Sequence, residues 1–113
     1  MNCDGVIAAC RAQAGATEGY PFGEGVLVFK VGGKMFAILS DNSVSLKCDP
    51  AFADIIRQQY AAVTAGYHLD KRHWNTIQLD GTVPGDQLKE WIEDSYALVV
   101  AGLSRAQRAS LSE

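Results

Sequence analysis

The apolar positions at the start of the chain predict a helix followed by a loop. Val6, Ile7 and Cys10 recur at helical spacing and share one stripe. We therefore expect a helix from about residue 3 to residue 14. Residues 17–23 are aromatic and rich in glycine and proline, so they predict a loop or a short edge strand.

Three apolar segments follow in quick succession, and turn residues separate them. Their β-branched side chains predict the strands of an antiparallel meander. The strands are expected at residues 26–31, 34–40 and 43–48. Gly32-Gly33 fits a two-residue hairpin turn because glycine readily adopts the positive φ that such a turn needs, and Asp41-Asn42 forms the second turn.

The second half of the chain predicts two helices with an extended segment between them. Asp49-Pro50 opens the first, since aspartate caps helix N-termini and proline suits the first helical position. Its apolar face would consist of Phe52, Ile55, Ile56 and Tyr60. The chain is then extended over residues 67–79, and the last helix begins near Pro84. This order predicts an α+β fold, with helices packed on an antiparallel sheet of the three-stranded meander plus one or two further strands.

Two-residue turns also predict which residues face each other across the meander. Lys30 would face Met35, Val28 would face Ala37, Leu39 would face Val44, and Ala37 would face Leu46. The face toward the helices would carry Val28, Met35, Ala37, Leu39, Val44, Leu46 and Cys48. The opposite, mixed face would carry Leu27, Phe29, Val31, Lys34, Phe36, Ile38, Ser43, Ser45 and Lys47. A mixed face of this kind is either covered by the chain itself or offered to a partner.

Length and composition indicate one soluble domain. The 113 residues suit a single domain, with its core over about residues 3–103 and a C-terminal tail over residues 104–113. No apolar run reaches the roughly 20 residues that span a bilayer, and the first residues lack the features of a signal peptide. Cys3, Cys10 and Cys48 show no paired spacing, so we expect reduced thiols in the cytoplasm.

The residues offer little support for catalysis. His68 and His73 lie five positions apart on the expected extended segment, so they would point to opposite faces and could not easily share a metal ion. Cys48 precedes a helix cap and is more simply a buried thiol than a nucleophile. No phosphate loop, serine-hydrolase motif or carboxylate pair is present. We expect no enzymatic activity, no metal site and no cofactor.

The segment from Tyr67 to Trp74 carries the strongest local basic signal. Strand alternation would place Lys71 and His73 on one side and Arg72 and Trp74 on the other, together with His68. An arginine beside a tryptophan and a histidine suits base stacking and phosphate contact. The alternative is structural: Trp74 would plug the end of the core, and the two cations would be solvated.

Several motifs in one order give the chain a family resemblance. They are Pro21-Phe22-Gly23, residues 28–37, Leu46-Lys47-Cys48-Asp49-Pro50, Tyr67-His68-Leu69, Lys71-Arg72-His73-Trp74-Asn75 and Ser95-Tyr96. On these motifs the chain resembles the MmcQ/YjbR family from about Thr17 to Leu103. The resemblance implies a compact bacterial α+β domain of the frataxin-like (CyaY-like) "double wing" fold. Members are commonly labelled as DNA-binding on grounds of fold, and the resemblance implies no enzymatic activity or cofactor.

Two functional hypotheses follow, and the net charge of −3 requires that any basic footprint be local. The first is a nucleic-acid-binding module of modest affinity that uses Lys30, Lys34, Lys47, His68, Lys71, Arg72, His73 and Trp74. The second is an adaptor that binds a protein or small ligand through the mixed face with Phe29 and Phe36. An iron-handling role would need an acidic ridge, and the first helix offers only Asp4. We expect DNA or a protein as partner, no membrane contact, and a monomer or weak dimer.

Overall fold

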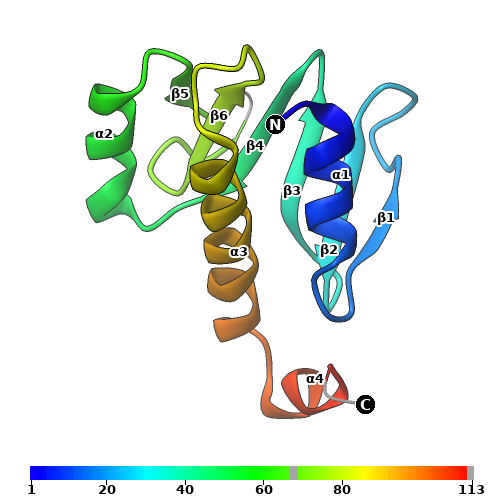
Figure 1. The fold of residues 1–113 in the computed structure, drawn as a ribbon. Coiled ribbons are helices and arrows are strands. Elements are labelled where there is room, and N and C mark those ends of the chain that lie inside the picture. The colour runs from blue at the N-terminus through cyan, green and yellow to red at the C-terminus, as the bar shows by residue number, and fades with distance from the viewer. Residues whose placement is uncertain (67–68, 112–113) are drawn as a thin grey trace.

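The computed structural model describes residues 1–66 and 69–111, and within them the chain forms a six-stranded antiparallel sheet with helices on one face (Figure 1). The elements are α1 (Cys3–Arg11), β1 (Thr17–Gly19), β2 (Leu27–Val31), β3 (Lys34–Ser40), β4 (Ser43–Lys47), α2 (Pro50–Gln59), β5 (Val63–Ala65), β6 (Trp74–Gln78), α3 (Gly85–Ala101) and α4 (Arg105–Ser110). The strand order across the sheet is β1-β2-β3-β4-β6-β5. The predicted α+β fold class is confirmed.

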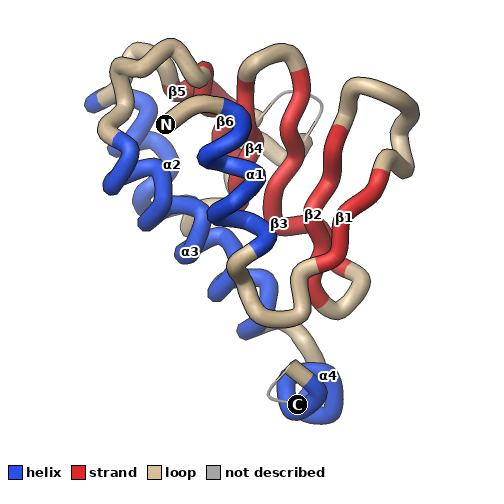
Figure 2. The backbone as a smooth tube through the Cα atoms, turned by 45° about the vertical axis from the view of Figure 1, so that its right-hand side comes forward, coloured by secondary structure: helices blue, strands red, loops and turns tan. Residues whose placement is uncertain are grey.

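The helices α1, α2 and α3 lie on the same side of the sheet (Figures 1 and 2). Helix α3 packs on β3 and β4, and α2 packs on β5 and β6 at the other edge. The short helix α4 lies beyond the end of α3, where the sequence predicted only a tail. No helix in the described part of the chain is both long and apolar enough to cross a membrane.

Local sequence chemistry sets the turns and caps of the meander. Gly32 and Gly33 have φ values of 58° and 80°, and Asp41 and Asn42 have φ values of 50° and 59°, so both hairpins have positive φ at their two central positions. The Asp49 carboxylate accepts a hydrogen bond from the Ala51 amide at 2.8 Å and caps α2. These predicted features are confirmed.

A β-bulge overturns part of the predicted register. Lys30 pairs with Met35 as expected, but the next residue of β2, Phe29, pairs with Ala37. Phe36 therefore has no partner in β2, and the predicted pairing of Val28 with Ala37 is wrong. The pairings of Leu39 with Val44 and of Ala37 with Leu46 are confirmed.

The bulge exchanges the faces of β2, so the predicted composition of both sheet faces needs correction. Phe29 and Val31 point toward the helices, and Phe36 joins them. Phe29 and Phe36 are fully buried, and the Phe36 ring meets Tyr96 edge to face at 5.5 Å. These two aromatics cannot serve an adaptor surface, because they form the centre of the core. Val28 and Met35, which the prediction placed against the helices, lie on the opposite face.

The segment before β6 is also not extended as predicted. Residues 71–73 form a turn, so the alternation assigned to this segment is wrong. Tyr67 and His68 lie outside the described residues. The predicted apolar face of α2 is only partly packed, since Phe52 is 59% exposed and Ile55 is 49% exposed, whereas Ala53 is buried.

Candidate functional site

The face of the sheet opposite the helices, which we call the open face, gathers two of the predicted cations and Trp74. The register assigns to it Thr17, Gly19, Val28, Lys30, Met35, Ile38, Ser40, Ser43, Ser45, Lys47, Thr64, Trp74, Thr76 and Gln78. None of these described strand positions carries a carboxylate. The open face is therefore basic although the whole chain is acidic.

Lys30, Lys47 and Trp74 lie at the same end of the open face. Lys47 and Trp74 are direct cross-strand partners, and each is half-buried. Lys30 lies two strands away, which is roughly 10 Å at the usual spacing between strands. Between these cations the face is uncharged, and Ser45 and Thr76 share a hydrogen bond of 2.8 Å there.

Ser95 of α3 binds the backbone of Lys47 and so fixes the end of β4 against the helix layer. Its hydroxyl donates to the Phe36 carbonyl at 2.6 Å and accepts from the Lys47 amide at 2.9 Å. Ser95 is fully buried in α3, so one side chain ties that helix to the bulge of β3 and to the end of β4. Ser95 is the polar residue in the buried stripe of α3, which otherwise consists of Leu88, Ile92 and Val99. A serine at such a position indicates a buried hydrogen bond, and the sequence prediction did not consider it.

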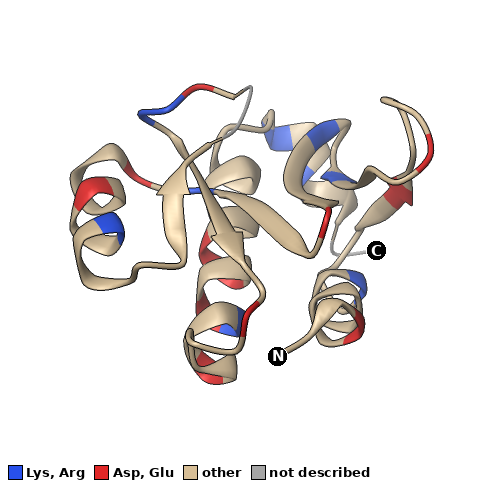
Figure 3. Cartoon of the chain, turned by 90° about the horizontal axis from the view of Figure 1, so that it is seen from above, with Lys and Arg blue, Asp and Glu red and all other residues tan. Residues whose placement is uncertain are grey.

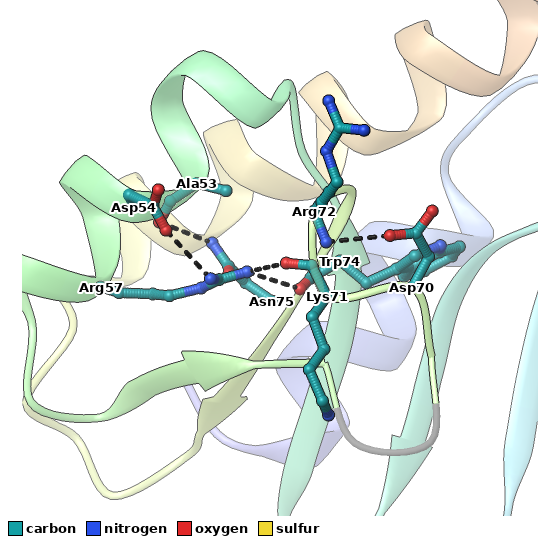
Figure 4. A network of polar contacts seen from close by, with 8 residues as sticks. All are labelled: Ala53, Asp54, Arg57, Asp70, Lys71, Arg72, Trp74 and Asn75. Atoms are coloured by element: carbon teal, nitrogen blue, oxygen red, sulfur yellow. Dashed lines mark hydrogen bonds and ion pairs between the residues drawn. The ribbon is translucent and has the colours of Figure 1, made fainter.

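The turn at residues 69–73 is built around Asp70. Its carboxylate accepts from the Arg72 amide at 2.9 Å, and its carbonyl accepts from the Trp74 amide at 3.0 Å. The side chains of Lys71 and Arg72 point in opposite directions (Figure 4). Lys71 Nζ donates to the Gly66 carbonyl at 3.3 Å, and the His73 ring lies 3.9 Å from the Asp70 carboxylate. Arg72 and Lys71 therefore do not form one patch.

Arg57 of α2 anchors this turn, and the sequence prediction missed it. Its Nε donates to Asn75 Oδ1 at 2.6 Å, while Nη2 donates to the carbonyls of Lys71 and Trp74 (Figure 4). Asn75 is buried and in turn donates to the Ala53 carbonyl. Arg57 lies one helical turn after Ala53, so it shares the helix face that packs on the sheet.

The structure does not bring Lys34 into the group. Its Nζ donates to the Gly102 carbonyl at 3.4 Å, at the C-terminal end of α3. Lys34 pairs with Val31, which faces the core, so its side chain belongs to the helix side of the sheet. The positive charge of Lys34 is favourable there, because the C-terminal end of a helix such as α3 carries a partial negative charge.

The acidic residues are concentrated on the other layer. Helix α3 carries Asp86, Glu90, Glu93 and Asp94 against a single lysine, Lys89. Figure 3 shows acidic positions along α3 on one side of the sheet and the turn at residues 69–73 on the other. The net charge of −3 is therefore unevenly distributed, with carboxylates on the helix layer and lysines on the open face.

The thiols of Cys10 and Cys48 are not activated as nucleophiles. Burial, followed by the Glu18 carboxylate, raises the pKa of Cys10 to about 12. Burial also raises the pKa of Cys48, and Asp49 and Asp94 add to the effect. Among the described residues, no three His, Cys, Asp or Glu side chains are close enough to share a metal ion.

Cys10 is expected to resist alkylation by iodoacetamide at pH 8, while Cys48 reacts slowly, because the thiolate is the reactive form. Peptide mass spectrometry of native and urea-unfolded protein measures both sites. Since the folded pKa of Cys10 is raised, its contribution to stability is complete below the ordinary thiol pKa of 9.0 and is lost as pH rises toward 12. Labelling of native Cys10 at the unfolded rate would contradict its burial.

Proteins of similar sequence and structure are found in several bacteria. The chain is 31% identical over 115 residues to Uncharacterized protein YjbR of Escherichia coli K12, covering 98% of each chain. It is 36% identical over 90 residues to Uncharacterized protein YbdF of Escherichia coli O157:H7, covering 76% of this chain and 74% of that one.

Two crystal structures share the fold. The Deinococcus radiodurans protein DR2400, described as a DUF419 domain, matches with a TM-score of 0.89 and 37% identity, over 96% of this chain and 86% of that one. A Pseudomonas syringae protein matches in fold with a TM-score of 0.78 and 23% identity, over 87% of this chain and 98% of that one. The model of the family described as YjbR matches residues 11–98. The chain therefore belongs to the YjbR family.

Proposed function

We propose that the protein is a nucleic-acid-binding module of modest affinity that contacts phosphates with the open face. The observation that supports this most is the placement of Lys30 and Lys47 on a sheet face whose strand positions carry no carboxylate. Phosphate contact by lysine releases counterions, and that release drives sequence-independent binding. Lys71 and Arg72 are exposed in the turn that leads into Trp74, and each adds positive charge there, with their side chains pointing in opposite directions (Figure 4).

The acidic helix layer does not prevent this contact at physiological salt. The exposed side of α3 is separated from the sheet by the helix itself, which is about 10 Å across with its side chains. The Debye length is about 8 Å at 0.15 M salt, so these carboxylates are largely screened at the open face. They instead repel nucleic acid from the helix side and orient the encounter.

Trp74 gives the face a second means of contact. It is half-buried beside Lys47, and a partly exposed indole can stack on an unpaired base. Base stacking on an aromatic side chain contributes about 1–3 kcal/mol and discriminates little between bases. We therefore expect single-stranded DNA to bind more tightly than duplex, with little sequence preference.

Neutralising the lysines of the open face is expected to reduce the salt dependence of DNA binding. With two or three phosphate contacts, log K should fall against log salt with a slope of about −2 to −3 on duplex. Lys30→Gln and Lys47→Gln should each reduce the slope by about 1. Fluorescence anisotropy with labelled random-sequence DNA, repeated over a range of salt concentrations, measures this slope for single strands and for duplex.

Lys89→Gln is the matched control, because it changes net charge equally on the opposite layer. It should leave slope and affinity unchanged, and thermal melts of all variants check that each is folded. Equal losses from Lys89→Gln and Lys47→Gln, or no binding by the parent protein at low salt, would refute the proposal.

A further inference from the structure

A groove of about 640 Å³ lies between α2 and α3, on the side of the molecule away from the open face. Its floor consists of buried core residues, Leu46, Val63 and Ile77. Its walls carry three of the five large apolar side chains that are exposed among the described residues: Phe52 and Ile55 from α2, and Leu98 from α3. The groove is thus the place where the helix layer fails to close over the sheet.

The groove stays open because α2 is held to the sheet at its other side. Ala53 is the buried contact of α2, and Arg57 anchors the helix by hydrogen bonds to the turn and β6. Across the groove, the rings of Tyr60 and Trp91 meet edge to face at 5.2 Å, near the end of α2 and the first half of α3. Phe52, eight positions before Tyr60, makes no ring contact with α3 among the described residues.

Carboxylates surround the apolar walls. Asp49, Glu90 and Asp94 line the groove. Lys47 also borders it, but its side chain belongs to the open face. Asp49 caps the start of α2 and Asp94 belongs to α3, so carboxylates from both sides line the groove. A ligand that fits this site must combine an apolar surface with positive charge.

We propose that the α2–α3 groove binds a basic amphipathic helix of a partner protein. Its apolar side chains would fill the space among Phe52, Ile55 and Leu98, and its lysines or arginines would face the three carboxylates. A helix suits the site because α2 is ten residues long, which is about 15 Å and matches two to three turns of a docked helix. The added helix would complete the layer that α1, α2 and α3 leave unfinished. This proposal does not depend on DNA binding.

The test uses the two tryptophans, which lie on different faces. A Trp74→Phe background leaves Trp91 as the only indole, so emission reports the groove. The probes are a synthetic amphipathic helix of leucine and lysine, about 15 residues long so that it can fold, and a twin with glutamate for lysine. The lysine peptide should shift the Trp91 emission and saturate, and the glutamate twin should not.

Matched variants separate the groove from the general surface. Glu90→Lys should weaken binding of the lysine peptide roughly tenfold. Glu93 is also exposed on α3 but lies outside the groove, so Glu93→Lys should weaken that binding less than about twofold. Phe52→Ser should weaken it similarly, whereas Phe22→Ser removes an equally exposed ring elsewhere and should not. Equal effects within either pair would overturn the proposal. It is also overturned if light scattering shows that the parent protein is a dimer that Phe52→Ser dissociates, because a second copy then occupies the groove.

Discussion

Replacing Ser95 by alanine is expected to lower the free energy of unfolding by about 3 kcal/mol, because two backbone groups would lose their partner inside the protein. The Ser95 hydroxyl serves both the Phe36 carbonyl and the Lys47 amide. Water cannot easily replace it, since Ser95 is fully buried. For a domain of this size the loss corresponds to a fall in Tm of about 12 °C. Urea unfolding followed by circular dichroism measures the difference.

Ser110→Ala provides the comparison for that experiment. The Ser110 hydroxyl also donates to a backbone carbonyl, that of Gln107, but it does so on the exposed helix α4. Its removal should change stability by less than about 0.5 kcal/mol. If the two serine variants melt together, the bulge does not depend on the hydrogen bonds of Ser95.

Replacing Arg57 by alanine is expected to cost about 3 kcal/mol and to loosen the turn before β6. The guanidinium satisfies Asn75 and the carbonyls of Lys71 and Trp74. A hydrogen bond to a charged group contributes a net of about 1.5–3 kcal/mol, and the three contacts of one partly exposed side chain do not add in full. Arg57→Lys should recover little, because an ammonium group cannot reach several acceptors as a planar fork does.

Hydrogen exchange distinguishes loss of this anchor from general destabilisation. In Arg57→Lys, the amides of His73 and Trp74 should exchange faster, while the amides of the β2–β3 hairpin should change much less. Arg108→Lys on exposed α4 should alter neither region. Uniform acceleration across the sheet would show that Arg57 supports the whole fold rather than the turn.

The parts of the fold that the sequence predicts are those decided by neighbouring residues. The hairpin turns follow from Gly32-Gly33 and Asp41-Asn42, and the start of α2 follows from Asp49-Pro50. Each of these depends on backbone preferences within a few positions. The same is true of the meander, whose three strands were placed within one residue of their ends.

The errors arise where distant residues decide. The bulge at Phe36 is stabilised by Ser95, which lies 59 positions away, so no pattern within β2 and β3 reveals it. The turn before β6 depends on hydrogen bonds from Arg57, which belongs to α2 and lies 14 positions before Lys71. The exposure of Phe52 depends on where α3 passes, and helical spacing alone indicates only that an apolar face exists.

The candidate site shows the same division. Lys30, Lys47 and Trp74 are each candidate contact residues in the sequence, but their common face follows only from the pairing of β2 with β3, β3 with β4 and β4 with β6. Lys34 looks equivalent to Lys30 along the chain. It is separated because the bulge and the hairpin turn direct it toward α3.

The two outer strands of the sheet also bear on how the protein behaves at high concentration. β1 and β5 are each three residues long, so either border offers only a short stretch of unpaired backbone to a neighbouring molecule. Short edge strands are one way in which proteins avoid pairing with the strands of other molecules and forming fibrils. The short outer strands therefore disfavour assembly by continuation of the hydrogen-bonded ladder and leave side-chain surfaces as the favoured route.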